Sequence, residues 1–229
     1  MIGQAKRTVS SHLPFLPFVV LSAWVFVVLA RVFLSRLSYP LDLEWMEGGI
    51  LTHALRLGRG QPLYAEPSVD FVSFLYTPLY PAVLCALSKI FGLSYMLGRA
   101  VSILAFSGAL VFLVAAVRAV AQQFESEELP AVATAAGLLG AAAVCLAFPF
   151  CGAFYDLVRG DSLWLFFVSA GLYSCSPGRS MRRIVLGALL LVLGLFTKQT
   201  AAPFMLAAAA SVALTSGIER GLVFSAVVF

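Results

Sequence analysis

The sequence has few charged residues, and this scarcity excludes an ordinary water-soluble fold. Only 11% of its 229 residues are charged and 61% are hydrophobic, whereas soluble domains have about 25% charged and roughly 45–50% apolar residues. A soluble domain of this length would need a polar shell. Because apolar runs recur along the whole chain, we expect lipid to be the solvent for most of it.

The chain also lacks a long basic run, although its formal net charge is +4. The 15 basic residues are scattered between apolar segments, so the sequence does not predict a protein that binds nucleic acid. The four cysteines form no CxxC pair and are expected to be small buried hydrophobic residues.

Common metal and nucleotide motifs are missing as well. There is no HExxH, Walker or GxGxxG sequence, so zincin and nucleotide-binding functions have no support. His12 and His53 are too few for a histidine-based metal site. A magnesium or manganese ion bound by carboxylates stays compatible with the sequence, but no specific cofactor is predicted.

What the sequence does contain is a series of apolar runs that predicts an all-α, polytopic transmembrane bundle, with residues 1–229 as a single domain. A helix needs about 20 apolar residues to cross a bilayer. The first run is too long for a signal peptide and indicates a retained anchor. The expected helices are Leu13–Leu34, Leu97–Ala121, Leu129–Phe150, Leu163–Cys175, Ile184–Thr197, Ala201–Leu214 and one that begins at Leu222.

The segment Pro78–Phe91 is expected to be a re-entrant or interfacial helix, because its 14 residues are too few for a span. With a cytoplasmic N-terminus, this choice places the basic loop RSMRR inside, as the positive-inside rule favours. The loop 35–98, with its juxtamembrane helices, then lies outside with the loop CGAFYDLVRGD and the junction TKQT. The short runs that flank RSMRR predict a cavity open to that outer side.

Three carboxylates follow the first span in the segment DLEWMEGG. Asp42, Glu44 and Glu47 precede an amphipathic helix that runs to Leu57. Glu44 and Glu47 either complement the N-terminus of that helix or form a site. The second interpretation follows from the position of Glu47 on the apolar face, where burial would raise its pKa and make it a usable general base.

Two further segments place charges on the same predicted outer face. In VRGD, Asp161 either caps the next helix and pairs with Arg159, or Arg159 clamps a phosphate while Asp161 holds a divalent cation or a hydroxyl. Lys198 is expected at the apex of a membrane hairpin, with Gln199 as its polar neighbour. It either snorkels to the interface or binds a lipid-linked phosphate.

An aromatic segment, QPLYAEPSVDFVSFLYTPLYP, lies between these elements. It carries Tyr64, Asp70 and Tyr76 among prolines. An interfacial aromatic belt accounts for most of it, and the alternative is that these side chains bind a sugar face or a hydroxyl.

In chain order, DLEWMEGG, GQPLY, YTPLYP, the arginine of LGRAVS, VRGD and LFTKQTA resemble membrane glycosyltransferases of the GT-C type. The resemblance is particularly to bacterial relatives of protein O-mannosyltransferases and aminoarabinose transferases. The chain departs from their usual Asp-Glu pair by having Met46-Glu47. It is also shorter than complete members and ends within the apolar sequence GLVFSAVVF, so we expect it to be the front portion of a longer enzyme.

The resemblance implies an enzyme of the cell (inner) membrane with its active site on the outer, periplasmic side. The donor would be a polyprenyl-phosphate sugar, and an acceptor hydroxyl would attack its anomeric carbon. The base would be Glu47 or Glu44, with Asp42 behind them, while Lys198 and Arg159 stabilise the departing phosphate. The expected substrate-binding residues are Arg159, Asp161, Lys198, Gln199, Tyr64, Asp70 and Tyr76.

Two other functions stay open at this stage. In a transporter or lipid flippase, the same charges would line a substrate path. The chain would otherwise be a non-catalytic membrane subunit or remnant.

Overall fold

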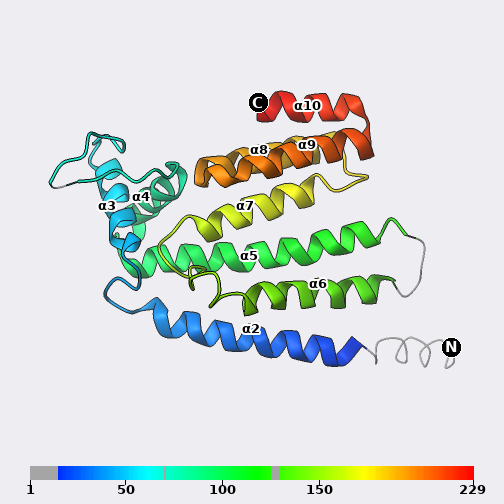
Figure 1. Ribbon diagram of the computed structural model, residues 1–229, viewed down its shortest axis with the longest axis horizontal. Coiled ribbons are helices and arrows are strands. Elements are labelled where there is room, and N and C mark those ends of the chain that lie inside the picture. Colours follow the sequence, from blue (N-terminus) through cyan, green and yellow to red (C-terminus); the bar gives the residue numbers. More distant parts are fainter. Residues whose placement is uncertain (1–14, 70, 125–128) are drawn as a thin grey trace.

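The computed structural model describes residues 15–69, 71–124 and 129–229, and in these ranges it consists of helices without strands. Most of the helices lie side by side with roughly parallel axes (Figure 1). These are α2 (Leu16–Leu37), α5 (Tyr95–Ala121), α6 (Leu129–Leu146), α7 (Asp161–Ser174), α8 (Met181–Thr197), α9 (Ala202–Ser216) and α10 (Ile218–Val228). The all-α class predicted from the sequence is therefore confirmed for the described residues.

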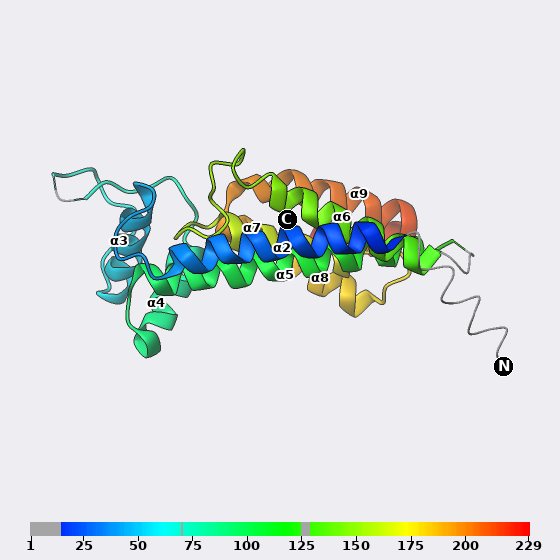
Figure 2. The same ribbon diagram turned by 90° about the horizontal axis from the view of Figure 1, so that it is seen from below.

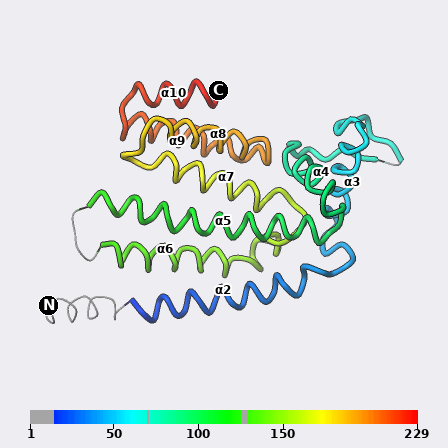
Figure 3. Tube along the Cα trace, turned by 180° about the vertical axis from the view of Figure 1, so that it is seen from behind, coloured from blue at the N-terminus to red at the C-terminus, as the bar shows by residue number. Residues whose placement is uncertain are grey.

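Two short helices cover one end of this bundle. They are α3 (Met46–Gly58) and α4 (Leu79–Phe91), and with the loop residues 59–69 and 71–78 between them they lie at the end of the bundle where α2 ends and α5 begins (Figure 2). We refer to this end as the α3–α4 end. The view from behind shows the same arrangement (Figure 3). The short turn η2 (Gln199–Ala201), which joins α8 to α9, lies at the side of the bundle that faces α4.

Helix length and composition divide the bundle into two groups. Helices α2, α5 and α6 are long and apolar enough to cross a membrane. Helices α7, α8, α9 and α10 have 14, 17, 15 and 11 residues, fewer than the roughly 20 of a full span. Most predicted bounds agree within a few residues. The predicted start at Leu13 lies outside the described residues, and the last helix begins at Ile218, ahead of the predicted Leu222.

Local sequence signals explain how the chain turns from α4 into α5. Helix α4 begins directly after Pro78 and ends at Phe91, before Gly92, whose φ of +75° suits glycine far better than other residues. The next helix is capped by Ser94, whose hydroxyl accepts a hydrogen bond from the backbone N–H of Leu97 at 3.2 Å. These two signals keep α4 short, as the interfacial interpretation expected.

A buried cluster fastens α3 and α4 to α5 and α7. Its members include Ile50, Leu84, Ala105 and Leu163. At its centre Tyr80 is 1% exposed. The Tyr80 hydroxyl lies 3.0 Å from the carbonyl oxygen of Gly98 and 2.8 Å from the hydroxyl of Ser102. The orientation of both short helices is thus fixed by apolar packing and by a satisfied buried hydroxyl.

Helices α7 and α8 approach closely because glycines face each other. A Cβ atom added to Gly187 would lie 2.8 Å from the carbonyl oxygen of Gly171 and 2.4 Å from the Sγ atom of Cys175. On α6, by contrast, a Cβ atom on Gly140 would meet nothing within 4 Å. These two glycines form a matched pair for testing the packing.

We predict that Gly187→Ala lowers the midpoint of thermal unfolding in detergent, because overpacking costs about 1–3 kcal/mol. The control Gly140→Ala should leave the midpoint unchanged or raise it, since alanine is favoured over glycine in a helix by about 1 kcal/mol. Equal midpoints for the two variants would contradict the close approach of α7 and α8.

Candidate functional site

A buried ion pair lies at the junction of α3 and α5. Arg99 Nε donates to Glu47 Oε1 at 3.0 Å and Arg99 Nη2 donates to Glu47 Oε2 at 2.7 Å. Both side chains are 0% exposed. The two parallel hydrogen bonds give the strong, directional geometry of a guanidinium–carboxylate pair.

The carboxylate of Glu47 also accepts two backbone hydrogen bonds. The N–H of Leu43 donates to Oε2 at 2.7 Å and the N–H of Val158 donates to Oε1 at 2.9 Å. Leu43 precedes Glu44 in the chain, and Val158 precedes Arg159. Glu47 therefore fixes two segments, 115 residues apart, that carry the charged side chains described below.

The guanidinium of Arg99 is satisfied by the segment that follows α2. It donates to the carbonyl oxygens of Arg36 at 3.1 Å, Tyr39 at 2.6 Å and Leu41 at 2.7 Å. These bonds let a full charge stay buried, because each polar hydrogen that leaves water finds a new acceptor. The pair thus connects the chain after α2, the start of α3, helix α5 and the loop before α7.

The electrostatics of Glu47 differ from the sequence-based expectation. Burial raises the pKa of its carboxyl group, but the hydrogen bonds from Arg99, Leu43 and Val158 outweigh burial and hold the pKa below its ordinary value of 4.5. The expected rise in pKa is therefore wrong. An ionised carboxylate with both oxygens engaged and no exposed surface is suited to positioning its neighbours.

A second group of charges is more open, and we name it the charge cluster. It consists of Glu44, Arg159, Asp161 and Lys198. Arg159 Nη1 lies 3.1 Å from Glu44 Oε2, and Arg159 Nε lies 2.9 Å from Asp161 Oδ2. Lys198 Nζ donates to Asp161 Oδ1 at 2.5 Å. The charges alternate along the cluster, and their side chains are 10–25% exposed.

The cluster brings together three distant chain segments that the sequence assigned to one face. Glu44 precedes α3, Asp161 begins α7, and Lys198 lies at the turn between α8 and η2. The apex position expected for Lys198 agrees with this turn. Neighbouring positive and negative side chains lower each other's free energy at partly buried positions, so the cluster holds the three segments in contact.

A narrow hollow adjoins the charge cluster. Its volume of about 10 Å³ is enough for about one water molecule. Met46 forms part of the wall, with its Sδ atom 2.9 Å from Arg159 Nη1 and 3.8 Å from the Tyr76 hydroxyl. A sugar needs movement of these side chains before it fits. The lining residues are Met46, Ile50, Tyr76, Thr77, Tyr80, Pro81, Arg159, Gly160, Asp161, Thr197 and Lys198.

Two residues predicted to bind substrate fasten the loop 59–78 in this structure. The Tyr64 hydroxyl donates to the carbonyl oxygen of Tyr76 at 2.7 Å. Gln199 Nε2 donates to the carbonyl oxygen of Leu75 at 2.7 Å. Both therefore hold the loop beside the hollow.

Other residues singled out from the sequence lie further from the hollow. Asp42 is exposed, and its Oδ1 atom accepts a hydrogen bond from the N–H of Gly48 at 2.9 Å in the first turn of α3. His53 is buried, with Nδ1 2.7 Å from the carbonyl oxygen of Gly49. Asp70 and His12 lie outside the described residues.

The carboxylates in the described ranges do not form a metal site. In the part of the chain that the structure describes, no group of three or more His, Cys, Asp or Glu residues is close enough to hold a metal ion. Glu44 and Asp161 both contact Arg159, whose guanidinium lies between them. Either carboxylate would have to break its ion pair with this arginine before it could coordinate a divalent cation.

One buried acid near the site was missed in the sequence. Asp156 is 1% exposed, and its Oδ2 atom lies 3.2 Å from Arg36 Nε. The geometry of this contact is unsuitable for a hydrogen bond, and neither carboxylate oxygen accepts one from the described residues. Burial raises the pKa of Asp156 to about 6, although Arg36 opposes the rise. Glu47 and Arg99 also act on its charge.

We predict that Glu47→Gln destabilises the protein by about 3–5 kcal/mol, because it leaves the buried charge of Arg99 uncompensated. The matched control Glu44→Gln removes a partly exposed carboxylate and should cost less. Adding Arg99→Met to a Glu47→Leu variant should recover part of the loss. Denaturant unfolding in micelles measures all of these, and similar losses for Glu47→Gln and Glu44→Gln would refute the structural role of the pair.

The pKa of Asp156 gives a pH-dependent prediction. Its folded-state pKa of about 6 exceeds the ordinary 3.8, so the stability that protonation provides is complete below pH 3.8 and is lost as the pH rises through 6. Asparagine does not titrate. The unfolding midpoint of Asp156→Asn, relative to the unsubstituted protein, should therefore rise between pH 4 and pH 7. A constant difference across that interval would argue against a buried, titrating Asp156.

Comparisons with known proteins assign no family to this arrangement. No family model, curated protein or solved structure matches the chain. The function is therefore inferred from the helices, the buried ion pair and the charge cluster.

Proposed function

We propose that this protein is a polytopic membrane protein whose α3–α4 end carries a site for sugar transfer. The lengths and composition of α2, α5 and α6 support membrane insertion. On α2, large apolar side chains such as Val20, Trp24 and Val27 are exposed on the outside of the bundle. A surface of this kind is stable in contact with lipid and is a liability in water.

The distribution of charge supports an outward-facing site. Both the buried ion pair and the charge cluster belong to the α3–α4 end. Arg179, Arg182 and Arg183 lie in and beside the turn between α7 and α8, at the opposite end. The positive-inside rule assigns that basic turn to the cytoplasm, so the α3–α4 end faces outward, on the periplasmic side of a cell (inner) membrane.

The single observation that carries the proposal is the charge cluster of Glu44, Arg159, Asp161 and Lys198, of which the last three line one hollow. Transfer from a polyprenyl-phosphate sugar requires a group that accepts a proton and groups that stabilise a phosphate. The cluster contains both. Glu44 is the better candidate base, because Glu47 is fully buried and its two oxygens are already bonded.

In the proposed reaction, the acceptor hydroxyl attacks the anomeric carbon of the donor and its proton passes to Glu44 or Asp161. The bond between the anomeric carbon and the phosphate oxygen breaks, and polyprenyl phosphate leaves. Lys198 and Arg159 stabilise the charge that develops on this phosphate. Because both cations are paired with carboxylates here, the donor phosphate would replace a carboxylate as their partner.

A non-catalytic membrane subunit is the second candidate, and two observations favour it. The hollow has a volume of about 10 Å³, and Met46 occupies the position where the GT-C resemblance implies the first acid of a pair. A transporter has less support, since the ion pairs found among the described residues gather at one end of the bundle.

We predict that Lys198→Ala and Glu44→Gln each reduce sugar transfer by about 100-fold or more, the usual effect of removing a group that stabilises a transition state. The matched control Lys89→Ala changes an exposed lysine on α4 and should keep full activity. The assay reconstitutes the full chain with radiolabelled polyprenyl-phosphate hexoses and pentoses and identifies labelled products.

Three results would separate the candidates. Labelled product that depends on Lys198 and Glu44 supports transfer. Movement of the labelled donor across the vesicle membrane without a new product indicates a flippase. Neither product nor movement with any donor indicates the non-catalytic subunit.

A further inference from the structure

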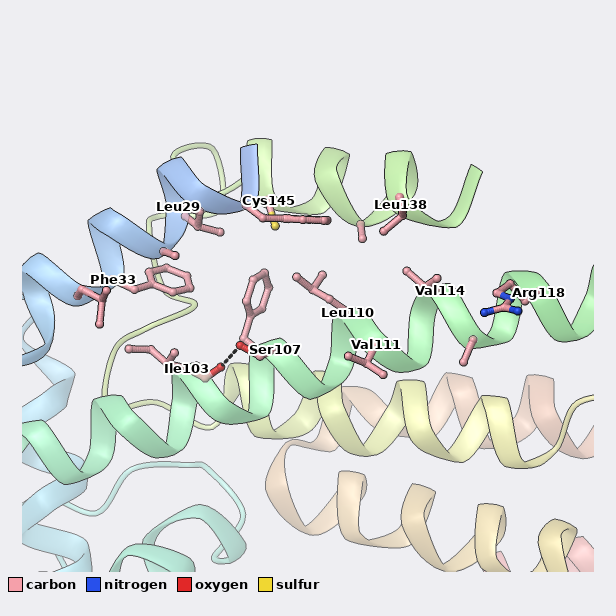
Figure 4. A pocket seen from close by; sticks show the side chains of 16 residues that line it. Leu29, Phe33, Ile103, Ser107, Leu110, Val111, Val114, Arg118, Leu138 and Cys145 are labelled. Carbon is pink, nitrogen blue, oxygen red and sulfur yellow. Dashed lines mark hydrogen bonds between the residues drawn. The ribbon is translucent and has the colours of Figure 1, made fainter. Parts of the chain in front are cut away.

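A long apolar groove runs between α2, α5 and α6, away from the charge cluster (Figure 4). Its volume is about 660 Å³, within the range of roughly 300–1,000 Å³ for ligand pockets. None of its lining residues borders the hollow of the charge cluster. Its lining includes Phe33, Ile103, Ser107, Ala115 and Arg118.

The length and chemistry of the groove suit an alkyl chain. Along α5 it extends from Ile103 to Arg118, which corresponds to about 22 Å at 1.5 Å per residue. This exceeds the roughly 15 Å of one leaflet, half of a hydrocarbon core about 30 Å thick. The hydroxyl of Ser107, a polar group within the wall, donates to the carbonyl oxygen of Ile103 at 2.8 Å (Figure 4). Because its proton is already used in this bond, the Ser107 hydroxyl offers a ligand no free donor.

One end of the groove carries a basic side chain. Arg118 lies in the last turn of α5, where Figure 4 shows it at the end of the groove away from Phe33. Arg118 also lines a second hollow of about 210 Å³, together with Gln122 and Phe124. The same arginine thus separates a long apolar space from a short space with polar groups. A molecule with an alkyl tail and an anionic head group would fit here, with the tail in the apolar groove and the head group at Arg118.

We propose that the groove binds an anionic phospholipid, with one acyl chain between α2, α5 and α6 and the phosphate on Arg118. Arg118 lies at the end of the bundle opposite α3 and α4, as do Arg179, in the turn between α7 and α8, and Arg182, in the first turn of α8. That end faces the cytoplasm in the orientation proposed above. Anionic lipids of the cytoplasmic leaflet collect at basic pockets between membrane helices.

The position of Arg118 indicates that the lipid in the groove is not the proposed sugar donor. Lys198, the proposed partner of the donor phosphate, lies at the α3–α4 end. A sugar donor held there cannot also place its phosphate on Arg118. The lipid in the groove is therefore a separate molecule, and it fills space that would otherwise leave α2 poorly packed against α5 and α6. This inference rests on membrane insertion but not on sugar transfer.

The test compares two lipids that have identical palmitoyl and oleoyl chains. The full chain is purified in detergent, delipidated and titrated with phosphatidylglycerol or phosphatidylcholine, and bound lipid is counted by native mass spectrometry. We expect phosphatidylglycerol to bind about tenfold more tightly and to raise the unfolding temperature, because it carries a net negative charge, whereas the choline cation of phosphatidylcholine offsets the charge of its phosphate beside the arginine. Arg118→Gln should remove this preference, whereas Arg182→Gln, at an exposed arginine outside the groove, should keep it.

A groove-filling variant tests the acyl chain separately. Ala115→Phe places a ring in the groove and should weaken binding of both lipids, while the fold is retained because the ring occupies existing space. Equal binding of the two lipids, or equal effects of Arg118→Gln and Arg182→Gln, would overturn the proposal. Should Ala115→Phe fail to fold, the comparison of the two arginines still decides. The titration contains no sugar, so failure of the transfer assay leaves its outcome unchanged.

Discussion

The architecture of the α3–α4 end depends on the buried ion pair between Glu47 and Arg99. Two charges at 0% exposure would be costly to remove from water without further partners. Backbone N–H groups on one side and carbonyl oxygens on the other supply those partners. The result is a junction at which four chain segments meet. Its stability requires each segment to keep its hydrogen bonds to the ion pair.

The charge cluster follows from this junction. Glu47 accepts hydrogen bonds from the N–H groups of Leu43 and Val158. The next residues along the chain are therefore close together, and Arg159 Nη1 lies 3.1 Å from Glu44 Oε2. Asp161 and Lys198 extend the series. A ligand with a phosphate would bind by exchanging partners within this series, so its affinity depends on how much more strongly the cations interact with phosphate than with carboxylate.

Much of the fold was predictable because apolar runs and glycine or proline boundaries are local signals. The short helix at Pro78–Phe91 and the turn at Lys198 were located this way. The partner of Glu47 was not, since nothing local links it to Arg99, which lies 52 residues further along the chain. An arginine near the start of a long apolar helix was the available signal. The buried Asp156 was missed because its loop shows no periodicity from which burial can be inferred.

The measurement that tests the central claim most directly is sidedness. With the four native cysteines replaced, single cysteines at the exposed positions Trp45 and Gln199 report on the two segments that the junction and the charge cluster bring to one end. A membrane-impermeant thiol reagent applied to intact cells should label both, whereas a cysteine at Arg182 should react only after permeabilisation. Labelling of Trp45→Cys and Gln199→Cys from opposite sides would contradict the account.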